Sequence, residues 1–165
     1  LYLGNYVPWD PNAHTKLIME KYDWKLAENS FERTYRKMSN LDDRYENGVH
    51  DLLKFIKFGY GRCSDHASKD VRTGYISRKD GVELVRKHDH VVSSDLFHWL
   101  DYVEMTEDEF WSIADTFREP HVWWIENGEW MKDNLWGDVS AYGKVGLDEQ
   151  GLKEFVAKGG KILTG

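Results

Sequence analysis

The spacing of hydrophobic residues predicts a mainly α-helical protein with at most a few short strands. The most regular stretch is 44–58, in which apolar side chains recur three and four residues apart and therefore share one face of a helix. These side chains are Val49, Leu52, Leu53 and Ile56. We expect this helix to form one wall of the hydrophobic core.

A second strong helix is predicted over 107–117. Thr106 and Glu109 have the spacing of a capping box, in which each side chain binds the backbone N–H of the other residue, and Pro120 follows the expected end of the helix. The stripe that we expect to be buried consists of Phe110, Ile113, Ala114 and Phe117.

Weaker patterns predict further helices along the chain. Asp10 is a good cap for a helix over 11–22, because a proline then takes the first helical position. Ser77 and Ser94 precede two shorter helices, and another helix is expected near 148–157. The side chains expected to be buried on these helices are Leu17, Ile18, Tyr22, Val82, Val85, Leu96, Trp99, Leu100, Leu152, Phe155 and Val156.

Two features indicate strands. Asn127-Gly128 favours the tight turn of a β-hairpin, and it lies between the apolar segments 122–125 and 130–131. The segment 1–5 has the pattern of a buried strand that ends in a loop. We therefore expect one strand near each end of the core.

Residues 23–43 show little periodicity and are predicted to form a long polar connection. The charged residues in it include Arg33, Arg36, Lys37, Asp42 and Asp43. A loop of this length in a compact chain is often functional, and the alternative is a loop that only wraps the surface. The sequence leaves both interpretations open.

The composition and net charge of the chain exclude several classes of protein function. The 165 residues suffice for one domain, and 22 Lys and Arg against 29 Asp and Glu give a formal net charge of −7. That balance argues against a general binder of nucleic acid or of acidic membranes. With Cys63 as the single cysteine, no disulfide forms within the chain, and a reducing, cytoplasmic setting fits best. No apolar run approaches the about 20 residues that cross a bilayer.

Aromatic residues are frequent, at 15% of the chain with 8 Trp. Two interpretations follow. The rings fill a Trp-rich core, or they stack on sugars or bases.

The stretch 59–72 carries the main candidate site. Ser64 is a good helix cap and Gly74 a good terminator, so a helix is predicted at about 65–73. Asp65, Lys69 and Arg72 then share one face, with His66 at its edge and Ala67 and Val71 on the opposite side. Free backbone N–H groups at the helix start, with Arg62 before them, are suited to a phosphate or carboxylate.

Structural interpretations stand beside this one. Asp65 and Lys69 have the spacing of an ordinary surface pair on a solvated helix. Cys63 is either a nucleophile or a small packed residue, and a nucleophile needs a base, for which His66 is only three residues away. His88 and His90 lack further partners at the spacing of metal ligands, so we assign no metal ligand.

The run GYGRCSDHASKDVR at 59–72 resembles a segment of the N-acetyl sugar amidotransferases, which belong to the PP-loop ATP pyrophosphatase superfamily. Three further stretches agree in the same order: LGNYVPWD at 3–10, WLDYV at 99–103 and VWWIENGEW at 122–130. The resemblance covers about residues 1–137.

This resemblance implies an ATP-dependent conversion of an N-acetyl sugar to an acetamidino sugar during the synthesis of lipopolysaccharide, O-antigen or another surface glycan. It implies ATP and Mg²⁺ as cofactors, a nucleotide-linked N-acetyl sugar as substrate, and a glutaminase subunit that supplies ammonia. The family's Ser-Gly-Gly-x-Asp-Ser loop and its N-terminal Cys pairs are absent from this sequence. We therefore expect 1–137 to be the helical C-terminal region of an α/β PP-loop enzyme, inactive by itself, and 138–165 to be a Gly-rich tail with one short helix.

The same resemblance gives the expected site. Arg62, Asp65, His66 and Lys69 are the expected catalytic residues. The expected substrate-binding residues are Tyr60, Gly61, Ser64 and Arg72. Cations among them can neutralise phosphate charge, and Asp65 or His66 can orient a cation, hold a sugar hydroxyl or move a proton. Two alternatives stay open: a non-catalytic helical module that docks a partner or holds the sugar, and a purely structural helical cap.

Overall fold

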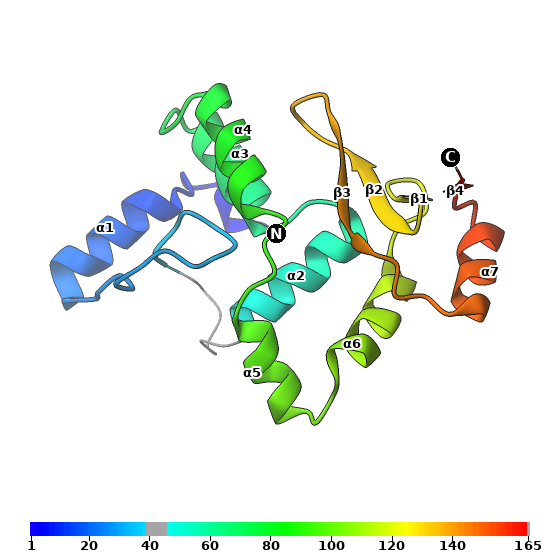
Figure 1. Ribbon diagram of the computed structural model, residues 1–165. Helices are drawn as coiled ribbons and strands as arrows, with labels where there is room; N and C mark the ends of the chain where they lie inside the picture. The colour runs from blue at the N-terminus through cyan, green and yellow to red at the C-terminus, as the bar shows by residue number, and fades with distance from the viewer. Residues whose placement is uncertain (39–45, 165) are drawn as a thin grey trace.

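The computed structural model describes residues 1–38 and 46–164, and in that part of the chain it has seven α-helices and four short strands (Figure 1). The predicted mainly α fold is therefore confirmed. The helices are α1 (Pro11–Tyr22), α2 (Glu46–Phe58), α3 (Arg62–Arg72), α4 (Arg78–His88), α5 (Asp95–Tyr102), α6 (Glu107–Ala114) and α7 (Glu149–Ala157). The strands are β1 (Trp124–Glu126), β2 (Glu129–Asp133), β3 (Val139–Lys144) and β4 (Ile162–Leu163), and two short 3-10 helices are η1 (Leu3–Asn5) and η2 (Asp115–Phe117).

Helix α2 lies at the centre of the molecule and packs on two sides. One side joins α5 and α6 in a core of Val49, Leu52, Ile56, Leu96, Leu100, Phe110 and Ala114. The predicted burial of Leu53 is wrong, because the second side of α2 is set by Phe55, which packs against the rings of Trp123 and Tyr142. The residues 44 and 45, predicted as the start of this helix, lie outside the described residues.

The capping box of α6 is present as predicted, but the helix ends at Ala114 rather than 117. Asp115 is fully buried there, where its carboxylate accepts from the Trp130 indole N–H at 2.7 Å and pairs with Arg118 at 2.7 Å. This turn into η2 leaves Ile113 and Phe117 exposed, against the predicted burial of both.

The predicted hairpin is confirmed and forms the middle of the sheet, whose strand order is β3-β2-β1-β4. Positive φ angles at Asn127 and Gly128, of 51° and 81°, make the tight turn. Trp123 and Trp130 are 1% and 0% exposed, in a second core cluster with Phe55, Ile125 and Phe155. For these two rings the core interpretation of the aromatic content holds.

The 138–165 segment contains the predicted helix, as α7, and in addition two strands of the sheet. β3 pairs antiparallel with β2, and β4 pairs parallel with β1. On α7, Phe155 is buried and Leu152 partly so, whereas Val156 is exposed against prediction because it points away from the sheet-side cluster.

Helix α1 has the predicted bounds and the predicted cap, since the Asp10 carboxylate accepts from the N–H of Asn12 at 2.9 Å. It buries no residue, so the predicted burial of Leu17 and Tyr22 is wrong, and Ile18 is only partly buried. A hydrogen bond from the Asn12 amide to the Asp70 carboxylate, rather than a buried apolar contact, joins it to α3. The predicted strand end at 1–5 is also wrong, because this exposed segment contains η1.

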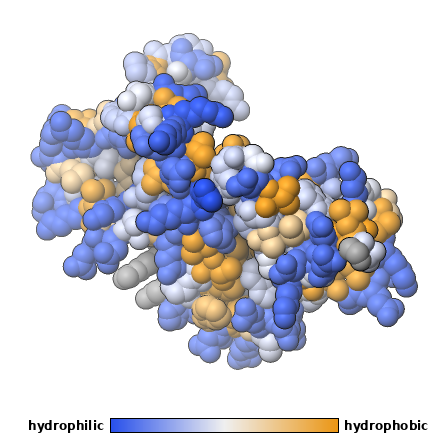
Figure 2. Space-filling model, turned by 45° about the horizontal axis from the view of Figure 1, so that its top comes forward, coloured by the Kyte–Doolittle hydropathy of each residue, from blue (hydrophilic) through white to orange (hydrophobic). Residues whose placement is uncertain are grey.

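Helices α4 and α5 follow the sequence pattern closely. Ser77 caps α4, which buries Val85 and half-buries Val82, and α5 half-buries Trp99 beside its two buried leucines. Hydrophilic side chains cover most of the face drawn in Figure 2, with separate hydrophobic patches between them. None of the helices within 1–38 and 46–164 is long and apolar enough to cross a membrane.

We predict that the capping box stabilises α6. Thr106→Ala removes the hydroxyl that accepts from the Glu109 N–H and should lower the free energy of unfolding by about 1 kcal/mol. Ser112→Ala, which removes a hydroxyl from the middle of the same helix, is the control. Equal urea midpoints for the parent and the Thr106 variant would show that the cap is unimportant.

We also predict that the buried Trp123 ring is structural. Trp123→Ala should lower the free energy of unfolding by about 3 kcal/mol or more, because it empties a ring-sized space in the core. Trp124→Ala, at the half-buried neighbour, should cost less. Thermal melts of the two variants compare them directly, and a larger loss at Trp124 would contradict this assignment.

Candidate functional site

Helix α3 carries most of the predicted site and begins earlier than predicted. Gly61 takes the cap position, so Ser64 lies in the first turn and is not the N-cap. The predicted end is confirmed, because Gly74 follows the last turn with a φ of 79°.

The start of α3 is capped by a side chain from the end of α4. The Asp89 carboxylate accepts from the N–H of Gly61 at 2.8 Å and of Ser64 at 3.1 Å, and from the Ser64 hydroxyl at 2.6 Å. Asp89 is 4% exposed. The backbone groups that the sequence offered to an external phosphate or carboxylate therefore already hold an anion of the protein itself.

A cleft of about 800 Å³, here called the sheet cleft, lies between α3 and α4 on one side and the β2–β3 part of the sheet on the other. Figure 1 shows where these elements lie. Four predicted site residues line it: Tyr60, Ser64, Asp65 and Arg72. Its volume is in the range of small-molecule sites.

A second cleft of about 330 Å³, here called the loop cleft, lies between α1, the 31–38 segment and the opposite side of α3. Arg62, His66 and Lys69 line it. The helix thus divides the predicted set between two clefts, and Gly61 is buried beneath Asp89. The predicted catalytic residues other than Asp65 face the loop cleft.

Two of the predicted charges are paired with α2. Arg62 Nε lies 2.9 Å from the buried Asp51 carboxylate, and Asp65 forms an ion pair with Lys54. The Lys54 ammonium also lies 4.7 Å from the centre of the Tyr60 ring. These pairs fix the orientation of α3 on α2.

His66 is neutral at physiological pH. Burial, followed by the positive charges of Arg36, Arg62 and Lys69, lowers its pKa to about 3. Its Nδ1 lies 2.7 Å from the Thr34 hydroxyl. A neutral imidazole here can accept or donate one hydrogen bond to a ligand, but it is not an acid at neutral pH.

Lys69 is the most available cation of the predicted set. It is exposed at the loop cleft, and within 1–38 and 46–164 it makes no hydrogen bond or ion pair through its amine. Arg72, by contrast, donates to the Ser68 hydroxyl at 2.7 Å.

Cys63 is a packed residue. It is 0% exposed within a cluster with Ala67 and Val85, and burial, followed by the charge of Asp89, raises its pKa to about 12. A protonated, inaccessible thiol is a poor nucleophile. Among the described residues no group of three or more His, Cys, Asp or Glu side chains is placed to hold a metal ion.

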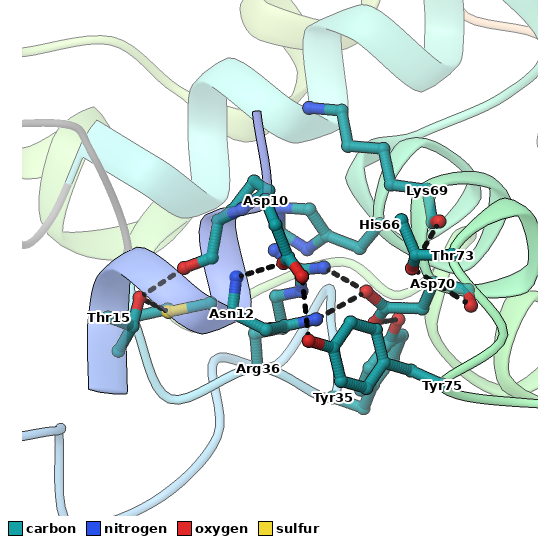
Figure 3. A network of polar contacts seen from close by, with 12 residues as sticks. Asp10, Asn12, Thr15, Tyr35, Arg36, His66, Lys69, Asp70, Thr73 and Tyr75 are labelled. Carbon is teal, nitrogen blue, oxygen red and sulfur yellow. Dashed lines mark hydrogen bonds and ion pairs between the residues drawn. The ribbon is translucent and has the colours of Figure 1, made fainter. Parts of the chain in front are cut away.

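The sequence did not reveal the buried polar network around Asp70 (Figure 3). Its carboxylate accepts from Asn12 at 2.8 Å, Arg36 at 2.5 Å and the Tyr35 hydroxyl, and so joins α1, the 31–38 segment and α3. Arg33, 2% exposed, donates to two backbone carbonyls, one of them that of Asp89. This part of the polar connection is therefore built into the fold, whereas Asp42 and Asp43 lie outside the described residues.

A second set of polar residues on the sheet cleft was also not predicted. Lys132 donates to the Asp133 carbonyl at 2.6 Å and to Asn134 Oδ1 at 3.2 Å, and the Tyr142 hydroxyl donates to the same oxygen. Burial lowers the pKa of Lys132. The alternation of β2, which turns Trp130 and Lys132 to the same side, was the available signal.

Comparison with known proteins identifies the family. Residues 28–135 match the family described as LPS biosynthesis protein WbpG-like, C-terminal domain. The chain belongs to this family. As a WbpG-like C-terminal domain it has a role in LPS biosynthesis, in agreement with the surface-glycan synthesis that the sequence implied. The match spans α2 to β2, and with it α3 and α4. No curated protein matches the chain.

We predict a pH dependence that arises from His66. The unfolded chain binds a proton at this residue below its ordinary pKa of about 6.5, and the folded chain does not until near pH 3, so stability is lost as the pH falls. From pH 7 to 5.5 the loss should be about 1 kcal/mol. Urea unfolding of the parent and of His66→Gln measures it. The same pH slope in both proteins would contradict the assignment.

Proposed function

We propose that this chain is the C-terminal part of an ATP-dependent amidotransferase that converts an N-acetyl sugar to an acetamidino sugar in LPS biosynthesis. The observation that carries the proposal is the family match over 28–135, which contains the α3 stretch by which the chain resembles sugar amidotransferases. In this reaction the amide oxygen of the substrate displaces pyrophosphate from ATP. Ammonia then adds to the amide carbon of this adenylate, and AMP leaves with the former amide oxygen.

The proposal assigns ATP and Mg²⁺ to a PP-loop domain outside this chain. The described residues offer no cluster of metal ligands, and the start of α3 is occupied by Asp89, so these residues do not fit a magnesium-bound triphosphate. A glutaminase partner supplies ammonia. This chain contributes the sugar-binding surface and charges that face the reacting groups.

The clefts give the predicted residues distinct tasks. Lys69, exposed and unpaired among the described residues, neutralises phosphate charge at the loop cleft, and His66 offers a neutral hydrogen-bonding group beside it. Arg62 and Asp65 orient α3 through their ion pairs with α2. Tyr60, Ser64 and Arg72 face the sheet cleft, on the substrate side.

The test is an amidotransfer assay in the polypeptide that joins this domain to its PP-loop domain. Lys69→Ala should lower the rate of AMP formation, in the presence of an acetylated sugar nucleotide and ammonium, by about 100-fold. Its thermal stability should change little, because an exposed charge contributes about 0–1 kcal/mol. Lys87→Ala, an exposed lysine at the end of α4, is the matched control.

Two outcomes would overturn the proposal. The first is AMP formation that depends on neither the sugar nor ammonium. The second is a normal rate for Lys69→Ala, which would remove the catalytic role and favour a non-catalytic module that docks a partner or holds the sugar.

A further inference from the structure

The sheet cleft has a lining of two chemical kinds. Most of its wall is apolar, from α3 and α4 and from the loop after β2. The apolar side chains include Val71, Val82, Val85, Leu135 and Trp136. Such a wall accepts methyl groups and the less polar face of a ring.

A polar cluster interrupts the apolar wall on the side of the sheet. Lys132 is 9% exposed, and its ammonium uses two of its three N–H donors on Asp133 and Asn134. Within the described residues it has no carboxylate in ion-pair contact. Asn134 is fixed in turn by Tyr142 and by the Ser140 hydroxyl, 2.8 Å from its amide nitrogen. The Lys132 ammonium also lies 5.5 Å from the centre of the Tyr142 ring, and its third N–H makes no hydrogen bond within the described residues.

Cations also outnumber unpaired anions around this cleft. Arg72 and Arg78 line it from α3 and α4, and both are exposed. Three carboxylates also line the cleft. Asp65 is paired with Lys54 and Asp89 caps α3, which leaves the exposed Asp133, next to Lys132, as the one without an ion pair among the described residues. The cleft therefore combines an apolar wall, a buried hydrogen-bond donor and two exposed cations.

We propose that the sheet cleft binds the acylated sugar through its phosphate-linked form, with Lys132 at the sugar and Arg72 and Arg78 at the phosphates. The acyl methyl lies on the apolar wall, and the third Lys132 donor meets a sugar or acyl oxygen. This inference rests on the proposed function, which supplies the reaction. It adds three residues that the sequence did not assign, namely Lys132, Asn134 and Arg78.

The sugar phosphate can come from a nucleotide or a lipid carrier, and the probes separate these sources. UDP-N-acetylglucosamine, N-acetylglucosamine 1-phosphate and UDP are titrated into the 165-residue chain, with calorimetry and the fluorescence change that is lost in Trp136→Phe as readouts. We expect the first two probes to bind and UDP alone to bind more weakly. Equal binding of the first two means that the sugar phosphate, and not the nucleotide, is recognised.

Variants locate the site. Lys132→Met keeps the volume of the buried aliphatic stem but removes the ammonium. It should raise the Kd for UDP-N-acetylglucosamine by about tenfold or more, as expected for a lost charged hydrogen bond. Lys144→Met, on the exposed side of β3, is its control. Arg78→Ala, exposed and therefore compatible with folding, should weaken binding, whereas its neighbour Lys79→Ala should not. If Lys132→Met reduces stability, Arg78→Ala still tests the site, because this exposed substitution leaves the fold intact.

Three results would overturn this inference. The first is that neither sugar phosphate binds to the folded chain, and the second is that the Kd is unchanged in both the Lys132 and the Arg78 variants. The third is loss of binding in Lys69→Ala alone, which would place the sugar in the loop cleft. Binding here with no AMP formation in the joined polypeptide would keep the site and overturn the proposed reaction. Normal AMP formation, together with unchanged Kd values in the Lys132 and Arg78 variants, would keep the proposed reaction and overturn the site.

Discussion

The carboxylate of Asp89 is the contact on which the arrangement of the two clefts depends. It accepts hydrogen bonds from the N–H groups of Gly61 and Ser64 at the start of α3, while Arg33 of the polar connection donates to the Asp89 backbone carbonyl. A helix start buried without such a partner would leave several donors unsatisfied. This single residue therefore joins three segments, and it gives α3 the orientation in which its two sides face different clefts.

Helix α2 supports that arrangement because it has two apolar sides and one charged side. Its apolar residues face both the α5–α6 core and the aromatic cluster of the sheet, while Asp51 and Lys54 on its remaining side pair with Arg62 and Asp65 of α3. The ion pairs add little energy where they are exposed, but the buried Asp51 requires its partner. The same helix thus supplies the core and positions the site.

Local signals in the sequence were enough to predict most helices, the α6 capping box, the hairpin turn and the end of α3. They failed where a distant residue decides the result. Asp89 displaced Ser64 as the cap, Asp115 ended α6 early, and Phe55 rather than Leu53 was buried. The strands β3 and β4 were missed because each is short and gains its bonds only from β1 and β2. The eight predicted site residues lie on or just before one helix, but periodicity alone did not reveal which cleft each faces.

The division of α3 into two sides has a chemical consequence for the proposed reaction. The loop cleft gathers Arg36, Arg62 and Lys69 around a histidine that burial, followed by their charges, keeps neutral, which is a setting for negative charge and not for acid catalysis. The sheet cleft is mostly apolar, with one buried amine and two exposed arginines, which is a setting for an acylated sugar phosphate. In the proposed reaction the acyl oxygen of the sugar attacks the α-phosphorus of ATP, so the sugar and the phosphates must come into direct contact. Helix α3 supplies residues to both environments, and because the clefts lie on its opposite sides, the reacting groups have to meet at an end of the helix and not across its width of about 10–12 Å.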